Sequence, residues 1–172
     1  MWRGARDVDA HGGCAFVRSL LRLDFTICLL YLMSKPAVTV AHMNAIGEGK
    51  FPGYLGMEIT SIDNGEVAAR MAVQPHHLAP NRFLHAGSVV TLADTCCGYA
   101  CRLNLPDGAE NFTTVELKSN HLGTARDGVI TCIAKPAHLG RTTQVWDAVV
   151  TNAATGKTIA IFRCTQMILY PK

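Results

Sequence analysis

The sequence predicts an α+β fold in which one antiparallel sheet wraps around a single long helix. Three observations predict it: a strong hairpin signal after residue 50, one extended segment of small and apolar residues at 86–100, and four strand-like runs after that segment. Because only one segment has a helical pattern, a parallel sheet built from βαβ units is disfavoured. A single sheet packed on one helix is the architecture that remains.

The hairpin signal is the sequence Asp63-Asn64-Gly65 between two apolar runs, 55–62 and 66–73. Asn and Gly tolerate the positive φ angles that tight hairpin turns require, so two antiparallel strands are expected here. The later strands are predicted at 112–121, 129–136, 142–152 and 158–169, and Gly128, Gly140 and Gly156 lie in or near the gaps between them. The predicted order is therefore two strands, one helix and four strands.

Length and composition favour one domain without a nucleic-acid partner. The chain has 172 residues, 49% of them hydrophobic, which is enough for one buried core. Its net charge of +3 comes from scattered Lys and Arg rather than from a basic run. The seven cysteines contain no C-x-x-C pair, and no second pair of His or Cys at ligand spacing accompanies Cys97 and Cys101. We therefore predict a reduced, cytoplasmic protein without a metal site.

The N-terminal residues 1–33 differ from the rest and are predicted to be a poorly ordered extension, with the folded domain at 34–172. Their apolar run, Phe25 to Met33, is far shorter than the roughly 20 residues that cross a bilayer, so we predict no membrane partner. Asp24 and Lys35 bracket that run, and no small-residue cleavage site for a secretory signal follows it. We interpret Met33 as the natural start of translation.

The predicted helix contains one charge that needs an explanation. Between Ala86 and Ala100, Asp94 is the single charged residue. Burying a carboxylate costs several kcal/mol unless the group is paired or hydrogen-bonded. Asp94 is therefore either a structural partner for another element or a reactive group in a cleft, and the residues alone leave both interpretations open.

His85 and Gly87 mark the start of the same helix. The first N–H groups of a helix have no internal acceptor and carry partial positive charge, so they can stabilise an oxyanion, although a histidine here can equally be a cap or a packing residue. His85 and Asp94 are nine residues apart, which is roughly 13 Å along a helix. They cannot both reach one carbonyl carbon. If both act, a second chain supplies one of them, and the site lies between protomers of at least a homodimer.

Three segments together resemble a known family: LHAGSVVTLADT, TTVELKSNHLGTARDG and HLGRTTQVWDAVVTNAATGKTIAIFRCTQMIL. In this order they are similar to the hotdog-fold acyl-CoA thioesterases of the phenylacetate-pathway (PaaI-like) type, over about residues 53–170. The resemblance implies a His-Gly-Gly motif at the helix start, with His85, Ala86 and Gly87 in its positions. It also implies that Asp94, nine residues after the histidine, is the nucleophile or general base, supplied by the neighbouring subunit.

Two further site residues follow from the resemblance. A hydroxyl on the strand after the helix orients the attacking water in some relatives, and that position falls on Thr114, next to Thr113. Relatives often have an Asn six residues before the histidine, where this chain has Ala79. The nearest Asn is Asn81, which either takes that role through an altered loop or only caps the helix.

The implied substrate is an acyl-CoA, and coenzyme A is part of that substrate rather than a cofactor. The phosphates of coenzyme A bind well to cationic side chains and exposed N–H groups. The candidate contacts are Arg141, Lys118, Asn120 and Arg126. Three residues before the helix are expected to line an apolar acyl pocket: Tyr54, Phe83 and Leu84. The resemblance further implies a homotetramer built from two dimers.

Two other classes of function stay open. A hotdog hydratase or dehydratase would act on acyl thioesters with a different His and acid spacing, and the position of Asp94 argues against it. A non-catalytic acyl-CoA binding or sensing protein would hold the ligand in the same groove, but such sensors normally carry a DNA-binding domain, and residues 1–50 show no helix-turn-helix pattern. No G-x-S-x-G, P-loop, G-x-G-x-x-G or H-E-x-x-H motif points elsewhere.

Overall fold

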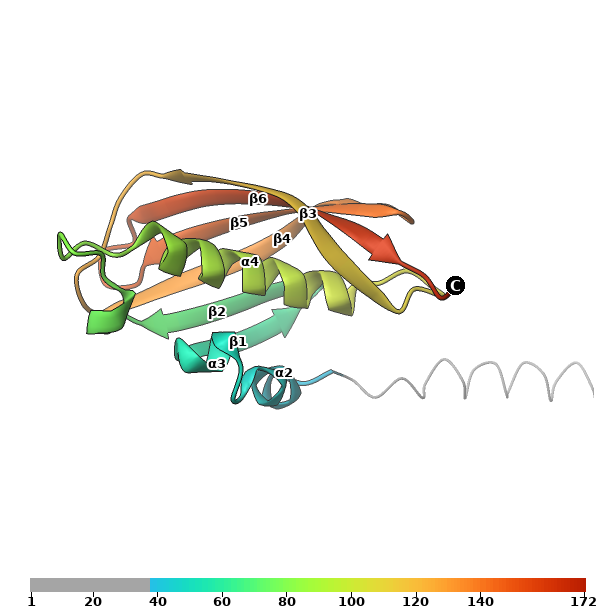
Figure 1. Cartoon of the computed structure of the whole chain (residues 1–172), viewed down its shortest axis with the longest axis horizontal. Helices are drawn as coiled ribbons and strands as arrows, with labels where there is room; N and C mark the ends of the chain where they lie inside the picture. The colour runs from blue at the N-terminus through green and yellow to red at the C-terminus, as the bar shows by residue number, and fades with distance from the viewer. Residues whose placement is uncertain (1–37) are drawn as a thin grey trace, which may run out of the picture. The chain divides into compact units, whose positions relative to one another are not determined.

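The computed structural model describes residues 38–172, which form one compact unit. The predicted extension, residues 1–33, lies outside the described residues. Figure 1 shows a curved sheet with one long helix along it and two short helices beside the first strand. In chain order the elements are α2 (Val40–Gly47), α3 (Phe51–Tyr54), β1 (Met57–Asp63), β2 (Glu66–Ala72), the 3-10 helix η1 (Pro75–His77), α4 (Ala86–Leu103), β3 (Asn111–His121), β4 (Val129–Leu139), β5 (Thr143–Asn152) and β6 (Thr158–Leu169).

All six strands form one antiparallel sheet in the order β1-β2-β4-β5-β6-β3, which confirms the predicted α+β architecture. The hairpin between β1 and β2 turns at Asn64 and Gly65, whose φ angles are 47° and 79°. Both angles lie in the left-handed region that Asn and Gly accept most easily. The chain passes from β2 through α4 to β3, which lies at the far edge of the sheet beside β6 (Figure 1).

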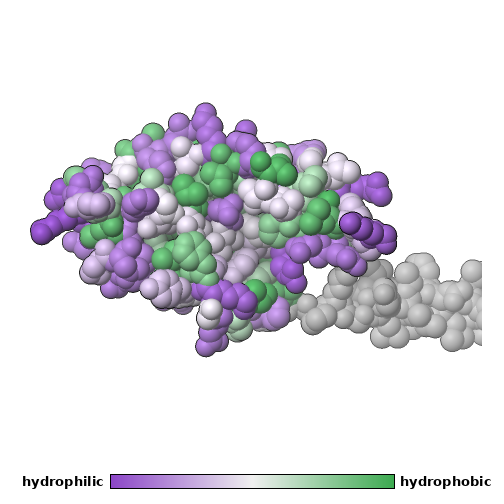
Figure 2. All heavy atoms as spheres, viewed as in Figure 1, coloured by the Kyte–Doolittle hydropathy of each residue, from purple (hydrophilic) through white to green (hydrophobic). Residues whose placement is uncertain are grey.

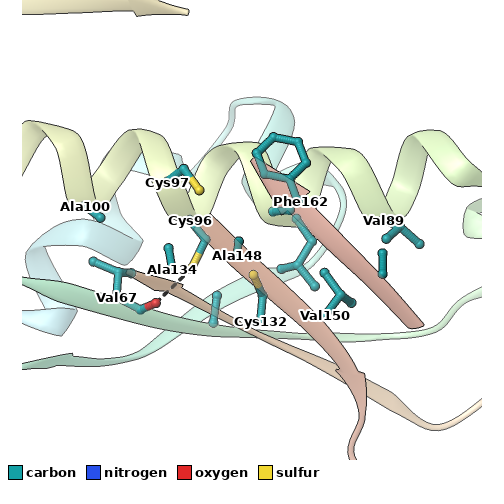
Figure 3. Packing of buried hydrophobic residues seen from close by; sticks show 14 of the residues in the cluster. Val67, Val89, Cys96, Cys97, Ala100, Cys132, Ala134, Ala148, Val150 and Phe162 are labelled. Carbon is teal, nitrogen blue, oxygen red and sulfur yellow. Dashed lines mark hydrogen bonds between the residues drawn. The ribbon is translucent and has the colours of Figure 1, made fainter. Parts of the chain in front are cut away.

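The core lies between α4 and the face of the sheet that the helix covers. Alternate residues of β2, β4, β5 and β6 point into it, and Trp146 and Phe162 are its largest aromatic members. Cys96 and Cys97 occupy the same layer as small apolar residues, and the Cys96 thiol donates a hydrogen bond to the Val67 carbonyl at 3.1 Å (Figure 3). Close approach of helix and sheet is possible because so many side chains at this contact are small.

The ends of α4 are fixed by two polar residues. His85 is the N-cap, and Asn104 is the C-cap. The Asn104 amide donates hydrogen bonds to the Ala100 carbonyl in the last helical turn and to the Gly65 carbonyl in the β1–β2 turn. The helix is thereby joined to the first hairpin at its C-terminal end.

In this chain the sheet covers only one face of α4, although the sequence predicts a sheet that wraps around the helix. One face packs on the sheet, while Thr91, Asp94 and Thr95 on the opposite side are only half-buried. The small residues allow close packing on one face, but the sheet of a single chain does not extend around the other. The uncovered face carries Asp94, so it is the part of the fold that positions the candidate site.

The short helices α2 and α3 were not predicted from the sequence. The Thr39 hydroxyl caps α2 by accepting from the His42 N–H at 3.2 Å. Asn44 then holds α2 against β1, because its side chain accepts from the Ile59 N–H at 2.8 Å and donates to the Ile59 carbonyl at 3.1 Å. The strand register shifts between Ile59 and Ser61, immediately beyond this contact. Side chains of both short helices reach the open face of α4.

Figure 2 shows one face of the molecule, on which hydrophobic and hydrophilic residues are interspersed without a single large apolar surface. Within residues 38–172, no helix combines the length and the apolar character needed to cross a membrane.

Candidate active site

Asp94 lies on the open face of α4 and lines a pocket of about 590 Å³. Helical periodicity brings Gly98 and Arg102 to the same side, one and two turns later. The other walls come from α2, α3 and β3: His42, Ile46, Pro52, Asn111, Phe112 and Thr114. The pocket is therefore a mostly apolar hollow with one carboxylate on its helical wall.

The Asp94 carboxylate has no partner that would make it a structural residue. Its Oδ1 is shielded from solvent and makes no hydrogen bond, and no ion pair within residues 38–172 includes it. Burial raises the pKa of this carboxyl group above its usual value of 3.8. A half-buried, unpaired carboxylate facing a pocket is the pattern of a reactive group, so the structure favours the second of the two interpretations.

Thr114 is the second predicted site residue that lines the Asp94 pocket. It lies on β3 opposite Gln166 of β6, directly before a shift in strand register. Its neighbour Thr113 pairs with Met167 and so faces the other side of the pleated sheet. Of the two threonines, Thr114 is the one placed to orient a water molecule near Asp94.

The first turn of α4 presents one free N–H. The His85 side chain caps the helix, with Nδ1 accepting from the Gly87 N–H at 2.8 Å. The His85 carbonyl accepts from the N–H groups of Ser88 and Val89 at 3.0 and 3.3 Å. The Ala86 N–H has no acceptor among the described residues. Of the predicted oxyanion residues, Ala86 therefore offers the available donor, whereas the Gly87 donor is occupied by His85.

His85 and Asp94 line different hollows of the chain. His85 and Gly87 border a separate pocket of about 300 Å³, together with Phe51, Leu55, His76, Leu78, Ser88 and Thr91. No residue is common to that pocket and the one that holds Asp94. This separation agrees with the distance that the helix spacing predicts, and one chain alone does not bring the two groups to a single carbonyl.

Because His85 is an N-cap, its removal has a defined cost. His85→Ala is expected to lower the free energy of unfolding by about 1 kcal/mol, since the Gly87 N–H loses its acceptor. His85→Asn supplies a good capping side chain and should restore most of that stability. Urea denaturation of the three proteins measures the difference. An alanine variant as stable as wild type would contradict the capping role.

Asn81 does not cap α4. Its Oδ1 accepts from the Phe83 N–H at 3.2 Å and closes a turn in the exposed loop before the helix. It lines neither of the two pockets at α4. The alternative in which Asn81 is the helix cap is therefore wrong, and a role for it in catalysis stays a prediction.

The predicted coenzyme A contacts do not form one cluster. Lys118 and Asn120 line a groove of about 370 Å³ on the outer face of the sheet, beside Arg163. Arg141 lies instead at the turn between β4 and β5, with its guanidinium carbon 5.2 Å from the centre of the Tyr170 ring. Arg126 stacks over Phe83 at 4.4 Å. The structure brings together only the first two of these residues.

The pocket beside Asp94 is lined by residues that the sequence did not reveal. Phe112 and Tyr99 supply its aromatic surface, whereas the expected lining residues, Tyr54, Phe83 and Leu84, do not border it. Tyr54 is 80% exposed, and Leu84 is buried in the core. Helical spacing from Asp94 could have indicated Gly98 and Arg102. No local pattern could have indicated the residues contributed by α2 and β3.

Residues 81–159 match the Thioesterase superfamily, a range that includes α4 and the candidate residues of its first turns. The chain is 33% identical over 115 residues to 1,4-dihydroxy-2-naphthoyl-CoA hydrolase of Escherichia coli K12, covering 65% of this chain and 82% of that protein.

Solved structures agree with the sequence match. A thioesterase from Pseudomonas aeruginosa is 30% identical, with a TM-score of 0.74 over 78% of this chain and 96% of that one. The PaaI protein of Escherichia coli, from the phenylacetic acid degradation operon, is 27% identical. Its TM-score is 0.65 over 76% of this chain and 96% of that one. The sheet, the long helix and the matched sequence together show that this chain belongs to the hotdog-fold thioesterase superfamily.

Proposed function

We propose that this protein hydrolyses an acyl-CoA thioester to the free acid and coenzyme A, with Asp94 as the central catalytic residue. The observation that carries the proposal is the Asp94 carboxylate itself, half-buried, unpaired and facing a pocket of about 590 Å³. The names of the relatives point to the same reaction class, since one is a CoA thioester hydrolase and another a proofreading thioesterase.

The proposed chemistry needs three groups. Asp94 removes a proton from a water molecule that attacks the thioester carbonyl, or it attacks that carbon directly to give an anhydride that water then cleaves. In either case the C–S bond breaks, and the thiolate leaves and takes up a proton. The Ala86 N–H of a partner chain stabilises the developing oxyanion, and Thr114 orients the water.

The lining of the Asp94 pocket supports an acyl group with an aromatic ring. The rings of Phe112 and Tyr99 flank it, and Ile46 and Pro52 add further apolar surface. Gly98 lets the Phe112 ring pack directly on α4, because a Cβ at that position would lie only 3.3 Å from a ring atom. A flat acyl group in contact with these aromatic side chains fits this lining better than a long straight chain does.

A homodimer through the β3 edge would complete the site. β3 pairs with β6 on one side only, so its other edge exposes backbone N–H and C=O groups that a second β3 can pair with. Val115 and Leu117 on this strand are 54% and 43% exposed. A partner chain that covered these apolar side chains would gain free energy by removing them from water. Because Thr114 and Phe112 lie on the same strand, such a dimer would form directly beside the Asp94 pocket.

The outer face of the sheet supports the further association of dimers into a tetramer. Ile133, Val149 and Ile161 are paired across β4, β5 and β6, and they form an exposed apolar row on the side away from α4. The neighbouring row of side chains alternates between negative and positive charge, and it forms the Glu66–Lys135 and Asp147–Arg163 ion pairs. A second sheet placed on this face by a two-fold axis could bury the apolar row against its own copy.

The proposed function is tested by release of free thiol from a panel of acyl-CoAs: phenylacetyl, hydroxybenzoyl, short, medium and long straight chains. We expect hydrolysis, with the highest kcat/KM for the aromatic members. Binding without hydrolysis of any member would favour the non-catalytic binding protein. Consumption of an enoyl-CoA without release of thiol would instead favour a hydratase.

A further inference from the structure

His77 is a buried histidine beneath the loop that leads into α4. Its side chain is 1% exposed, and it ends the short helix η1 after β2. The ring packs edge-on against His76, with the ring centres 4.1 Å apart. The proposed hydrolysis uses neither of its nitrogen atoms, so a histidine in this buried position needs another explanation.

The hydrogen bonds of His77 connect η1 to the first turn of α4. Its Nδ1 accepts from the Gln74 N–H at 3.0 Å. Its backbone carbonyl accepts from the His85 N–H at 2.9 Å and from the Ser88 hydroxyl at 3.0 Å. The side chain therefore bonds to Gln74, the N-cap of η1 just after β2, and the main chain of the same residue holds the N-cap of α4. The Ala86 N–H directly follows that N-cap.

These contacts require a neutral ring. Nδ1 must keep its lone pair to accept from Gln74, so the ring proton is on Nε2, which is buried without a hydrogen-bond partner. A proton on Nδ1 would face the Gln74 N–H, and two donors repel each other. Burial lowers the pKa of His77 most, and the neighbouring His76 lowers it further. The backbone carbonyls of Leu55 and Ala72 attract a ring proton and so raise the pKa in part.

We propose that His77 is a positioning residue that holds the first turn of α4, and with it the Ala86 N–H, in the geometry that thioester hydrolysis requires. The inference rests on the proposed function. Losing the Gln74 contact releases the loop between β2 and α4, and a displacement of about 1 Å at a catalytic group can lower a rate by roughly 100-fold. Protonation of the ring breaks the same contact, so acid should have the same effect on the loop.

The kinetic test compares His77→Leu, His77→Asn and Trp146→Phe with wild type in the thiol-release assay at pH 8. Leucine fills the space without an acceptor and should lower kcat by about 10- to 100-fold, with KM changed by less than about threefold. The asparagine oxygen can replace Nδ1 and should return kcat to within about threefold of wild type. Trp146→Phe removes a buried hydrogen bond to Gln144 under the other end of α4, and it controls for lost stability. A leucine variant with wild-type kcat overturns the proposal.

A second measurement does not depend on activity. In NMR spectra of the whole protein at pH 8, the amide signals of His85 and Ala86 should shift in His77→Leu and return close to their wild-type positions in His77→Asn. As the pH is lowered, the amide signal of Gln74 should change together with the His77 ring, at a pH below the usual histidine range. Amide signals of His85 and Ala86 that are the same in His77→Leu as in wild type overturn the positioning role. A wild type that hydrolyses no thioester would overturn the proposed function, and these shifts would still decide whether His77 holds the helix.

Discussion

Replacing Asp94 by asparagine is expected to lower kcat for acyl-CoA hydrolysis by about 100- to 10,000-fold, the range that general-base residues contribute. Asparagine has nearly the same shape, so the pocket and the binding of substrate should persist, and KM should change little. The loss would then be confined to the chemical step. Thiol release measured side by side for the two proteins gives the ratio. Asp107→Asn, in the exposed turn before β3, is the matched control and should keep wild-type kcat.

The same substitution should not destabilise the protein. The Asp94 carboxyl is shielded on one oxygen and unpaired, and burial raises its pKa above 3.8. Between pH 3.8 and that raised pKa the folded state binds more protons than the unfolded state, so the free energy of unfolding falls as the pH rises through this interval. Asparagine removes the buried charge, so the Tm at pH 7 should be equal or higher. A large loss of Tm with retained activity would mean that Asp94 is structural.

The fold was predictable because each of its signals is local. Asn64 and Gly65 identify the first hairpin, and the glycines between the later runs separate the remaining strands. The long helix follows from its uninterrupted small and apolar residues. The helices α2 and α3 were not predicted, because they are short and depend on contacts with residues distant in sequence. One example is the pair of hydrogen bonds between Asn44 and Ile59 of β1.

The candidate site was predictable only in part. Asp94 stands out because a single charge in an apolar helix is costly, and the structure places it with Thr114 in one pocket. Sequence spacing could not show that His85 occupies the Gly87 N–H and leaves that of Ala86 free, since this depends on a side-chain conformation. The role of His77 was hidden for a similar reason: its carbonyl meets the helix start through the folded path of the loop.

A site shared between two chains makes a strong prediction about mixed dimers. Ala86→Pro removes the one N–H proposed to hold the oxyanion, and proline is well accommodated at the first position of a helix. His85 already has the extended backbone, φ −66° and ψ 135°, that a residue before proline prefers. The Ala86→Pro protein should therefore fold, keep its Tm within a few degrees, and lose most of its activity.

Dimers that contain one Asp94→Asn chain and one Ala86→Pro chain should regain activity. In such a dimer one site carries both substitutions, and the other combines Asp94 from the proline chain with Ala86 from the asparagine chain, so it is intact. Co-expression with two different affinity tags and sequential purification isolates these dimers, which should show about half the wild-type kcat per dimer. The two parent variants remain nearly inactive and serve as controls. Only a site built across two chains can be repaired by combining two variant chains. Mixed dimers as inactive as their parents would therefore place the whole site within one chain. So would light scattering that shows the active protein to be a monomer.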